Sequence, residues 1–512
     1  MNQGRQPPAT QPTLFEQVWL DGRLEDHLDT VYRDPGVPAP VVESGTASGL
    51  TYTKRAVARA AGRVSRASGR GGGTTAPGRL LLRMAPGAID ALGRRLRGGV
   101  TLISSTNGKT TTARMLASIL EADGRAVVHN RAGANTHWGV ATALAEHDGD
   151  TGVFEVDEAW LPLIAAQLRP RVVVLGNLFR DRLDGYGELD RLIRVWRGLL
   201  SGAAAPAVVV ANADDPLLAG PGAVLAGARS ARLLFGIEDA HAGSHSPEHP
   251  NDGHSCLACG QRLRYTRAFV GHLGHYHCDR CGTTRPRPSV RAASVRERGL
   301  DAADARIVLP SGSLSVRLPF GGLHNVYNAL AASGAAVSIG VAPGAIRDGL
   351  ASVSAPFGRS ETIVVDGRAV RLCLVKNPAG ANATIRTLSG ERSDHALHLW
   401  IALNDAEPDG RDVSWIWDVQ FECLSAHVGR VTCSGRRANE LALRLKYAGW
   451  SCPLEVNASL HESFARALAH TPAALVAMPT YTALLGLRTV LNERGVAVSD
   501  WGHSARAARA TP

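Results

Sequence analysis

Short β-branched runs alternate with helical stretches over most of the 512-residue chain. In the first half, the runs typical of buried strands are 100–106, 126–129, 152–156, 172–175 and 207–211. A second series follows at 369–375, 397–403, 428–433, 455–456 and 474–478. Strands that alternate with helices in this way form a mostly parallel sheet covered by helices on both faces. The sequence therefore predicts an α/β fold with two such domains.

Breaks in the alternation set the expected domain boundaries. The first part of the chain is proline-rich, then basic from Lys54 to Arg70, and ends in a glycine triplet, which predicts a flexible segment. An amphipathic helix is expected over 80–96. The expected divisions are a disordered basic leader at 1–78, a central domain at 79–356 with an insertion at about 250–288, a second, Rossmann-like α/β domain at 357–500 and a basic tail at 501–512.

Charge and hydropathy exclude several classes of protein. The net charge of +10 fits an anionic partner but does not distinguish nucleotide, nucleic acid and an anionic membrane surface. No run of 18 or more apolar residues is present, and the N-terminus lacks a signal-peptide core, so we expect a cytoplasmic protein. Only four lysines stand among the 56 Lys and Arg residues, and two of them, Lys109 and Lys376, lie in the motifs described next.

The sharpest motif is Ser105-Thr-Asn-Gly-Lys-Thr-Thr-Thr112, which lies between a strand and a helix. Backbone N–H groups and the positive end of the helix dipole would face a phosphate there. Lys109 can reach the β- and γ-phosphates of a nucleotide, and Thr110 can hold Mg²⁺. The strict P-loop spacing is not met, because Ile103 stands where its first glycine belongs. The motif nevertheless predicts a phosphate-binding loop.

An acidic group, Glu155, Asp157 and Glu158, lies at the end of the strand 152–156. Ligands of α/β sheets gather at the carboxyl ends of the strands. A carboxylate in that position can hold the Mg²⁺ that bridges nucleotide phosphates. A solvated helix start would give the same pattern, and the residues alone leave both interpretations open.

Two CxxC pairs, Cys256/Cys259 and Cys278/Cys281, are each followed by glycine. Four thiolates at this spacing can close a tetrahedral shell around Zn²⁺ with no open position. The pattern therefore predicts a structural zinc ribbon. The nearby histidines are expected to be surface residues; they are His254, His272, His275 and His277.

Two clusters follow strands in the C-terminal half. Lys376-Asn-Pro-Ala-Gly380 follows the strand 369–375, and the loop from Asp409 to Asp418 contains three acids and two tryptophans. An acid-rich loop at a strand end is a candidate functional site. Because Asp-Gly is also a turn signal, a capped turn remains an equal alternative.

Taken together and in order, the motifs resemble the central ATPase domain of the Mur ligases. They are T-N-G-K-T-T-T at 106–112, N-R-A-G-A-N at 130–135, F-E-V-D-E-A at 154–159, N-L-F-R-D-R-L-D at 177–184, N-A-D-D-P at 212–216 and G-L-H-N-V-Y-N at 322–328. The zinc ribbon and the K-N-P-A-G and D-G-R-D-V-S-W-I-W-D motifs are similar to those of the MurT family, the ligase-like subunits of lipid II isoglutaminyl synthase. The resemblance covers about residues 79–500.

The resemblance implies an activity. The family amidates the α-carboxyl of the D-glutamate in the lipid II stem peptide, through an acyl phosphate formed with ATP. Ammonia comes from glutamine, which a GatD-like glutaminase partner hydrolyses, and an aspartate of the ligase subunit completes the partner's catalytic triad. By position that aspartate is Asp412, with Asp409 second. A lipid II substrate implies work at the inner face of the membrane, and nucleic acid is not an expected partner.

The resemblance also assigns site residues. The catalytic group would comprise Lys109, Glu155, Asp412 and Asp409. The nucleotide would contact Thr106, Asn107, Gly108, Lys109, Thr110, Thr111, Asn212, Asp215, Asn325 and Asn328, with the last two against the adenine. Mg²⁺ would be held by Thr110 and Glu155.

Three departures from the Mur pattern stand out. Ser105 replaces the usual glycine before T-N-G-K, and Arg182 replaces a histidine, which makes a second metal ion doubtful. Residues 1–78 also lack the strand–helix alternation of the front UDP-binding domain.

Two other functions compete. A stand-alone Mur or folylpolyglutamate-type ligase would add a whole amino acid, but the missing front domain and the D-G-R-D-V-S-W segment count against it. A zinc-ribbon regulator would bind nucleic acid, but the ribbon has no adjoining dense basic or aromatic stripe.

Overall fold

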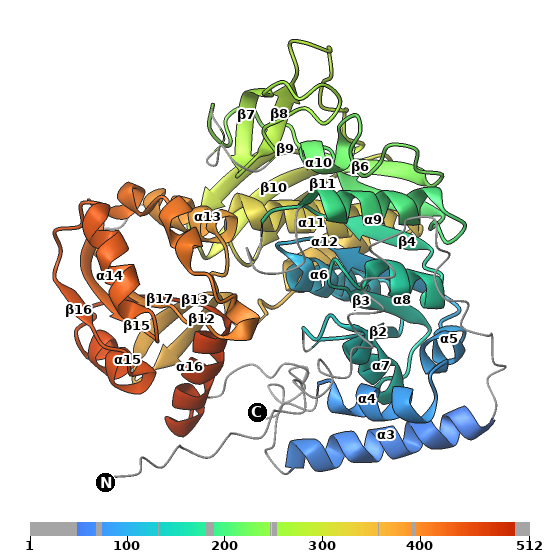
Figure 1. The fold of residues 1–512 in the computed structure, drawn as a ribbon, viewed down its shortest axis with the longest axis horizontal. Helices are drawn as coiled ribbons and strands as arrows, with labels where there is room; N and C mark the ends of the chain where they lie inside the picture. Colours follow the sequence, from blue (N-terminus) through green and yellow to red (C-terminus); the bar gives the residue numbers. More distant parts are fainter. Residues whose placement is uncertain are drawn as a thin grey trace, which may run out of the picture.

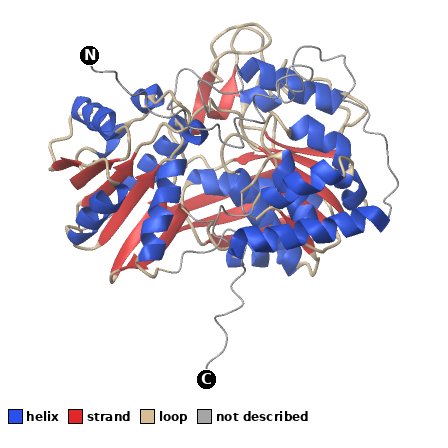
Figure 2. Ribbon diagram, turned by 60° about the horizontal axis from the view of Figure 1, so that its bottom comes forward, coloured by secondary structure: helices blue, strands red, loops and turns tan. Residues whose placement is uncertain are grey.

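The computed structural model describes residues 49–67, 74–131, 133–180, 189–245, 247, 253–356, 358–391 and 395–496. These residues form two α/β domains that lie side by side, a larger central domain and a smaller C-terminal domain (Figure 1). Each has a mainly parallel sheet between layers of helices (Figure 2). The predicted fold class is therefore confirmed.

The described central sheet has nine strands in the order β11-β10-β9-β6-β5-β4-β1-β3-β2. They are β1 (Gly99–Ser104), β2 (Val127–His129), β3 (Thr151–Glu155), β4 (Val172–Leu175), β5 (Val208–Asn212), β6 (Ala231–Ile237), β9 (Val290–Arg298), β10 (Ala302–Leu309) and β11 (Gly312–Leu318). The pairings from β2 across to β9 are parallel. Their carboxyl ends therefore meet at one edge of the sheet, where Ile103 of β1 is level with Glu155 of β3.

The sequence patterns missed the strands β9, β10 and β11, which extend the sheet beyond β6 and pair with one another in antiparallel fashion. Along β11 buried residues alternate with exposed ones, as in Leu314, Val316 and Leu318 against their neighbours. Such alternation is typical of an antiparallel strand with one solvated face. The expected strands were continuous apolar runs, a pattern that belongs to strands buried on both faces.

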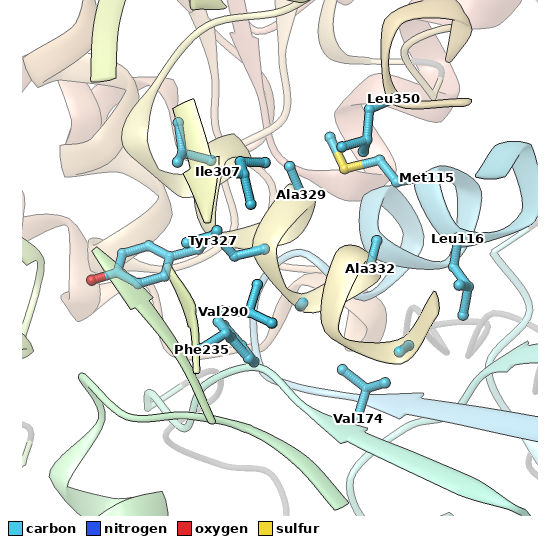
Figure 3. Close-up of a cluster of buried hydrophobic side chains, with 14 of the residues drawn as sticks. Met115, Leu116, Val174, Phe235, Val290, Ile307, Tyr327, Ala329, Ala332 and Leu350 are labelled. Carbon is cyan, nitrogen blue, oxygen red and sulfur yellow. The ribbon is translucent and has the colours of Figure 1, made fainter. Parts of the chain in front are cut away.

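Helices cover both faces of the central sheet. They are α5 (Ala88–Gly93), α6 (Lys109–Ala122), α7 (His137–Glu146), α8 (Leu161–Leu168), α9 (Leu189–Ser201), α10 (Pro216–Ala219), α11 (Leu323–Ser338) and α12 (Pro343–Ser352). Figure 3 shows one of the two cores, in which Met115 of α6 lies beside Leu350 of α12 and Val174 of β4 belongs to the same cluster. The adjacent Val173 belongs to the core on the opposite face. Both faces of the sheet are therefore buried, as a parallel sheet requires.

The predicted flexible leader is wrong for its last part. Gly49–Ala67 form helix α3, which lies along α4 (Ala76–Met84) and α7 (Figure 1). Arg55 Nε and Arg59 Nε both donate to Ala145 O at the C-terminal end of α7, and both arginines pair with Asp148. These arginines satisfy the free carbonyls of a helix end and interact with its negative dipole. Residues 1–48 and 68–73 of the predicted leader lie outside the described residues, as does the basic tail.

The helix expected over 80–96 is also wrong, because two helices, α4 and α5, occupy that region. Pro86 and Gly87 separate them. Proline removes a backbone donor and glycine weakens a helix interior, so the chain turns at this point. The periodicity of apolar residues alone does not predict that the helix is interrupted here.

The C-terminal sheet has six strands in the order β12-β13-β17-β14-β15-β16. They are β12 (Arg359–Val365), β13 (Arg368–Cys373), β14 (Leu397–Ala402), β15 (Val428–Ser434), β16 (Leu454–Val456) and β17 (Ala474–Pro479). Its helices are α13 (Pro378–Ser389), α14 (Ala438–Tyr447), α15 (Leu460–Ala469) and α16 (Tyr481–Glu493), with 3₁₀ turns η1 (Glu407–Asp409), η2 (Ser414–Asp418) and η3 (Phe421–Leu424). β12 is antiparallel and the other pairings are parallel.

An insertion separates β6 from β9. It contains the two-stranded hairpin of β7 (Arg264–Val270) and β8 (Leu273–His277), which stands above the central sheet in Figure 1. Across the described parts of the chain, no helix has both the length and the apolar character needed to cross a membrane.

Candidate functional site

The loop at residues 105–108 joins β1 to α6 at the carboxyl edge of the central sheet. Asn177, which follows β4, fixes this loop: its Oδ1 accepts from Asn107 N at 2.9 Å and its Nδ2 donates to Asn107 O at 3.0 Å. Gly108 has a left-handed φ of 89°, and an added Cβ would lie 2.1 Å from Asn328 Oδ1. Glycine is therefore required here both by the backbone and by the close approach of α11.

Lys109 begins α6 and is buried beside the loop; it does not line the pocket described below. Its Nζ lies 2.9 Å from Glu158 Oε2 and also donates to Ser105 O. The two charged side chains are only 8% and 5% exposed. Removing one member of such a buried ion pair is strongly destabilising. Glu158 therefore orients the lysine over the loop.

Glu155 has the features of a cation ligand. It is buried at the end of β3, and within the described part of the chain its Oε2 has no hydrogen-bond partner. Burial raises the pKa of this carboxyl, and the hydrogen bond from Thr110 and the charges of Arg359 and Lys109 oppose that rise. A buried carboxylate oxygen without a partner, beside a threonine hydroxyl, fits a Mg²⁺ ion.

A pocket lies between the two domains, lined by residues of both. The phosphate loop contributes Asn107, Gly108 and Thr111. The opposite side includes Lys376 of the C-terminal domain. The other lining residues are Asn177, Phe179, Val270, Leu273, His324, Asn325, Tyr327, Asn328, Arg359, Ser360, Cys373, Leu374, Ala379, Gly380, Ala383 and Thr384. The pocket thus brings together the loop and the predicted adenine residues Asn325 and Asn328.

The amide side chains on α11 form a chain of hydrogen bonds beside the loop. Asn328 Nδ2 donates to Asn325 Oδ1 at 3.1 Å, and Asn328 Oδ1 accepts from Thr112 Oγ1 at 3.2 Å. His324, one turn earlier, also lines the pocket, and burial lowers its pKa to about 4. The imidazole is therefore neutral at physiological pH. Its position was not singled out from the sequence, although it lies inside the G-L-H-N motif.

A reciprocal amide pair connects the phosphate loop to the C-terminal domain. Asn107 Nδ2 donates to Asn377 Oδ1 at 3.2 Å, and Asn377 Nδ2 donates to Asn107 Oδ1 at 3.0 Å. Asn377 also caps α13 by accepting from Gly380 N. The K-N-P-A-G motif therefore lies at the domain boundary, and the capping residue explains why asparagine precedes the proline.

Asn212 and Asp215 are fully buried and do not line the pocket. Asp215 caps α10, accepts from Leu178 N at 2.9 Å and lies 3.2 Å from His272 Nε2. Through these contacts Asp215 fixes the segments that follow β4 and β5, and its carboxylate does not face the pocket. The expectation that His272 and His254 are surface residues is wrong, since both are buried. Arg182 lies outside the described residues.

The two aspartates proposed to serve a partner differ in environment. Asp409 is buried, and its carboxylate accepts from Thr482 N at 2.9 Å and from the Thr482 hydroxyl in the first turn of α16. Asp412 is exposed, and a hydrogen bond from Ser414 lowers its pKa. The first therefore serves as a helix cap, whereas the second is an ionised carboxylate that a partner protein can reach.

The four cysteines of the insertion lie together, with their sulfur atoms all within 4.8 Å of one another. Cys256 Sγ and Cys281 Sγ are 3.6 Å apart, and Cys259 Sγ and Cys278 Sγ are 3.5 Å apart. Tetrahedral Zn–S bonds of about 2.3 Å require sulfur atoms about 3.8 Å apart, whereas a disulfide bond requires about 2.05 Å. The cluster is therefore arranged as a metal site.

The parallel sheet, the phosphate loop at its carboxyl edge and the pocket against a second α/β domain define a Mur-type ligase. Residues 103–276 match the family model of the Mur ligase middle domain, and 374–484 match that of the MurT ligase C-terminal domain. A solved pseudomurein peptide ligase type C from Methanothermus fervidus has the same fold, with a TM-score of 0.64 at 23% identity over 79% of this chain and 81% of that chain.

The chain belongs to the MurT family of ligase subunits. It is 30% identical to the "Lipid II isoglutaminyl synthase (glutamine-hydrolyzing) subunit MurT" of Staphylococcus aureus strain N315, over 86% of this chain and 98% of that protein. The same subunit of Streptococcus pneumoniae strain R6 is 29% identical over 83% of this chain and 94% of its own length. The Mur fold is that of ATP- and Mg²⁺-dependent ligases of peptidoglycan synthesis.

Proposed function

We propose that this protein amidates the α-carboxyl of D-glutamate in the lipid II stem peptide, with ATP as the activating substrate and ammonia as the nitrogen donor. The observation that carries the proposal is the pocket between the phosphate loop and the MurT-type C-terminal domain, which joins Gly108 to Lys376. A carboxylate is a poor electrophile, and phosphorylation converts it into an acyl phosphate with a good leaving group.

The atoms balance in two steps. A substrate carboxylate oxygen attacks the γ-phosphorus of ATP, and ADP leaves. The ammonia nitrogen then attacks the acyl carbon, phosphate leaves with the carboxyl oxygen, and the nitrogen loses one proton. Closure of the two domains around the substrates would exclude water, which would otherwise hydrolyse the acyl phosphate.

The chain's own residues stabilise the charge that develops in the first step. The backbone of residues 107–111 and the Lys109 ammonium bind the β- and γ-phosphates at the start of α6. Glu158 keeps that ammonium over the loop. Thr110 and Glu155 would hold Mg²⁺, which would neutralise the charge of the phosphate oxygens. Asn325 and Asn328 offer amide groups to the adenine edge.

A glutaminase subunit of GatD type would supply the ammonia. Asp412 is exposed and ionised, which suits a carboxylate that orients a partner's histidine. The nearby surface has exposed aromatic residues, since Trp417 is 50% and Tyr447 72% exposed and their rings lie 5.6 Å apart. Exposed aromatic groups beside a charged residue are typical of protein interfaces. The lipid substrate implies that the complex works at the inner membrane face.

The choice of nitrogen donor tests this function. Purified protein with lipid II, ATP and Mg²⁺ should form the amide with ammonium chloride alone, and with glutamine only when the glutaminase is added. Mass spectrometry of the product distinguishes an amide, which lowers the mass by about 1 Da, from an added amino acid. Incorporation of a whole amino acid would instead establish a stand-alone ligase.

The Cys₄ cluster would hold one structural Zn²⁺. Replacing Cys278 and Cys281 together by serine should remove the zinc and lower the unfolding temperature by roughly 4–8 °C, because a loss of about 2 kcal/mol shifts the transition of a domain this large by that amount. Metal analysis and thermal unfolding measure both effects. Cys423→Ser, at an exposed position in the other domain, is the control. Full thermal stability in a zinc-free double variant would contradict the structural role.

A further inference from the structure

The tip of the Cys₄ insertion reaches the pocket between the domains. Val270 ends β7 and Leu273 begins β8, so the hairpin turns between them. Both side chains are buried, at 5% and 2% exposure, and both line the pocket. Beside them lies Phe179, which follows β4 and lines the same pocket. The insertion is therefore part of the site and not only an appendage of the central domain.

The turn is fixed in position by contacts at its apex. His272 is fully buried, its Nε2 lies 3.2 Å from Asp215 Oδ1, and its ring lies 4.7 Å from that of Phe179. Gly271 has a φ of 54°, and an added Cβ would lie 2.7 Å from the Phe179 ring. Only glycine allows the turn to approach this ring so closely. The turn and Phe179 thus form one rigid apolar surface.

The base of the insertion is held as firmly. Arg285, which follows the second CxxC pair, forms an ion pair with the fully buried Asp214 and lies 2.7 Å from Glu238. Asp214 also accepts from the Tyr327 hydroxyl at 2.6 Å, and Tyr327 lines the pocket from α11. Gly274 N donates to Asp214 O at 2.9 Å. The insertion is thereby anchored to the helix that carries Asn325 and Asn328.

The chemistry of the lining assigns the occupant of this part of the pocket. Phosphates belong at the loop, where backbone donors and Lys109 are found, and apolar side chains do not stabilise them. A heteroaromatic ring needs an apolar surface for its face and amide groups for its edge. The turn with Phe179 provides the first and the asparagines of α11 provide the second.

We propose that Val270, Leu273 and Phe179 form the surface against which the base of the nucleotide packs, so that the Cys₄ insertion contributes directly to nucleotide binding. The inference rests on the proposed use of ATP in this pocket. The hairpin would then have a role in nucleotide affinity in addition to the structural role of the Cys₄ cluster.

Binding of two triphosphate-like anions, one with a nucleoside and one without, tests the proposal. Titration calorimetry on the full-length, zinc-loaded protein measures the Kd of a non-hydrolysable ATP analogue and of tripolyphosphate, both with Mg²⁺. Leu273→Ala should weaken the ATP analogue by roughly five- to tenfold, because apolar contact with the ring is lost, and leave tripolyphosphate unchanged. Leu273→Met keeps the volume and should keep the affinity.

Leu263→Ala is the matched control, because Leu263 is buried in the insertion's own small core and does not line the pocket. It should bind both anions like the wild type. If Leu273→Ala does not fold, Val270→Ala replaces it, and the same selective loss of affinity for the ATP analogue is expected. Unchanged affinity for the ATP analogue in these variants, or an equal loss for both anions, would overturn the proposal. A wild-type protein that binds neither anion would instead refute the proposed function.

Discussion

Lys109→Met should reduce ATP-dependent amidation by roughly a thousandfold, measured as product formed from lipid II with ammonium as the donor. The loss follows from removing a positive charge that stabilises the transferred phosphoryl group in a site sheltered from water. Lys446→Met is the control, because Lys446 is exposed on α14 and belongs to no site. Its activity should equal that of the wild type.

The same substitution has a second effect that separates chemistry from stability. It removes one member of the buried Lys109–Glu158 ion pair, which costs about 3–5 kcal/mol of unfolding free energy. The double variant Lys109→Met/Glu158→Gln removes both charges and should recover most of that stability in urea unfolding, while activity stays low. Recovery of activity in the double variant would mean that Lys109 does not act on the phosphates.

Asp412→Asn should abolish amidation driven by glutamine and leave amidation driven by ammonium intact. Loss of the carboxylate that orients a catalytic histidine lowers hydrolysis by about 10⁴-fold, whereas the ATP site lies elsewhere in the chain. The two reactions are compared on the assembled complex, with glutaminase binding checked separately by size-exclusion chromatography. Wild-type glutamine-driven activity in this variant would refute the assignment.

Asp409→Asn provides the contrasting control. Its carboxylate caps the first turn of α16, so the substitution should lower stability by about 1 kcal/mol. The donor ratio should not change, because glutamine- and ammonium-driven activities fall together when the fold is weakened. A selective loss of the glutamine reaction in Asp409→Asn would exchange the roles of the two residues.

Local patterns predicted the elements that form the site. The turn at Gly108 and the start of α6 at Lys109 follow from residues within a few positions of one another, as does the clustering of four cysteines. Strand ends in a parallel sheet meet at one edge by geometry, which placed Glu155 near the loop before the fold was known.

Contacts between distant residues could not be predicted in the same way. Nothing near Lys109 in the sequence singles out Glu158 over Glu155 or Asp157 as its ion-pair partner; only the path of the chain after β3 decides it. The same holds for His272, whose local sequence does not indicate that it becomes fully buried with its Nε2 beside Asp215 Oδ1. Helix α3 was not predicted because its arginines resemble a run of solvated charges. In the structure Arg55 and Arg59 donate hydrogen bonds to Ala145 O of α7.

The Asn107–Asn377 pair has a consequence for how the two domains move. Two neutral hydrogen bonds contribute only about 1 kcal/mol each, and the neighbouring Arg180–Asp418 pair at 3.4 Å is partly exposed and weaker still. Thermal motion opens these two contacts readily, while the Arg371–Asp301 ion pair and the hydrogen bond from Leu300 N to Glu391 still join the domains. A nucleotide that competes for the Asn107 amide would therefore break the Asn107–Asn377 pair. Its own contacts with both domains would then determine how the two domains are positioned.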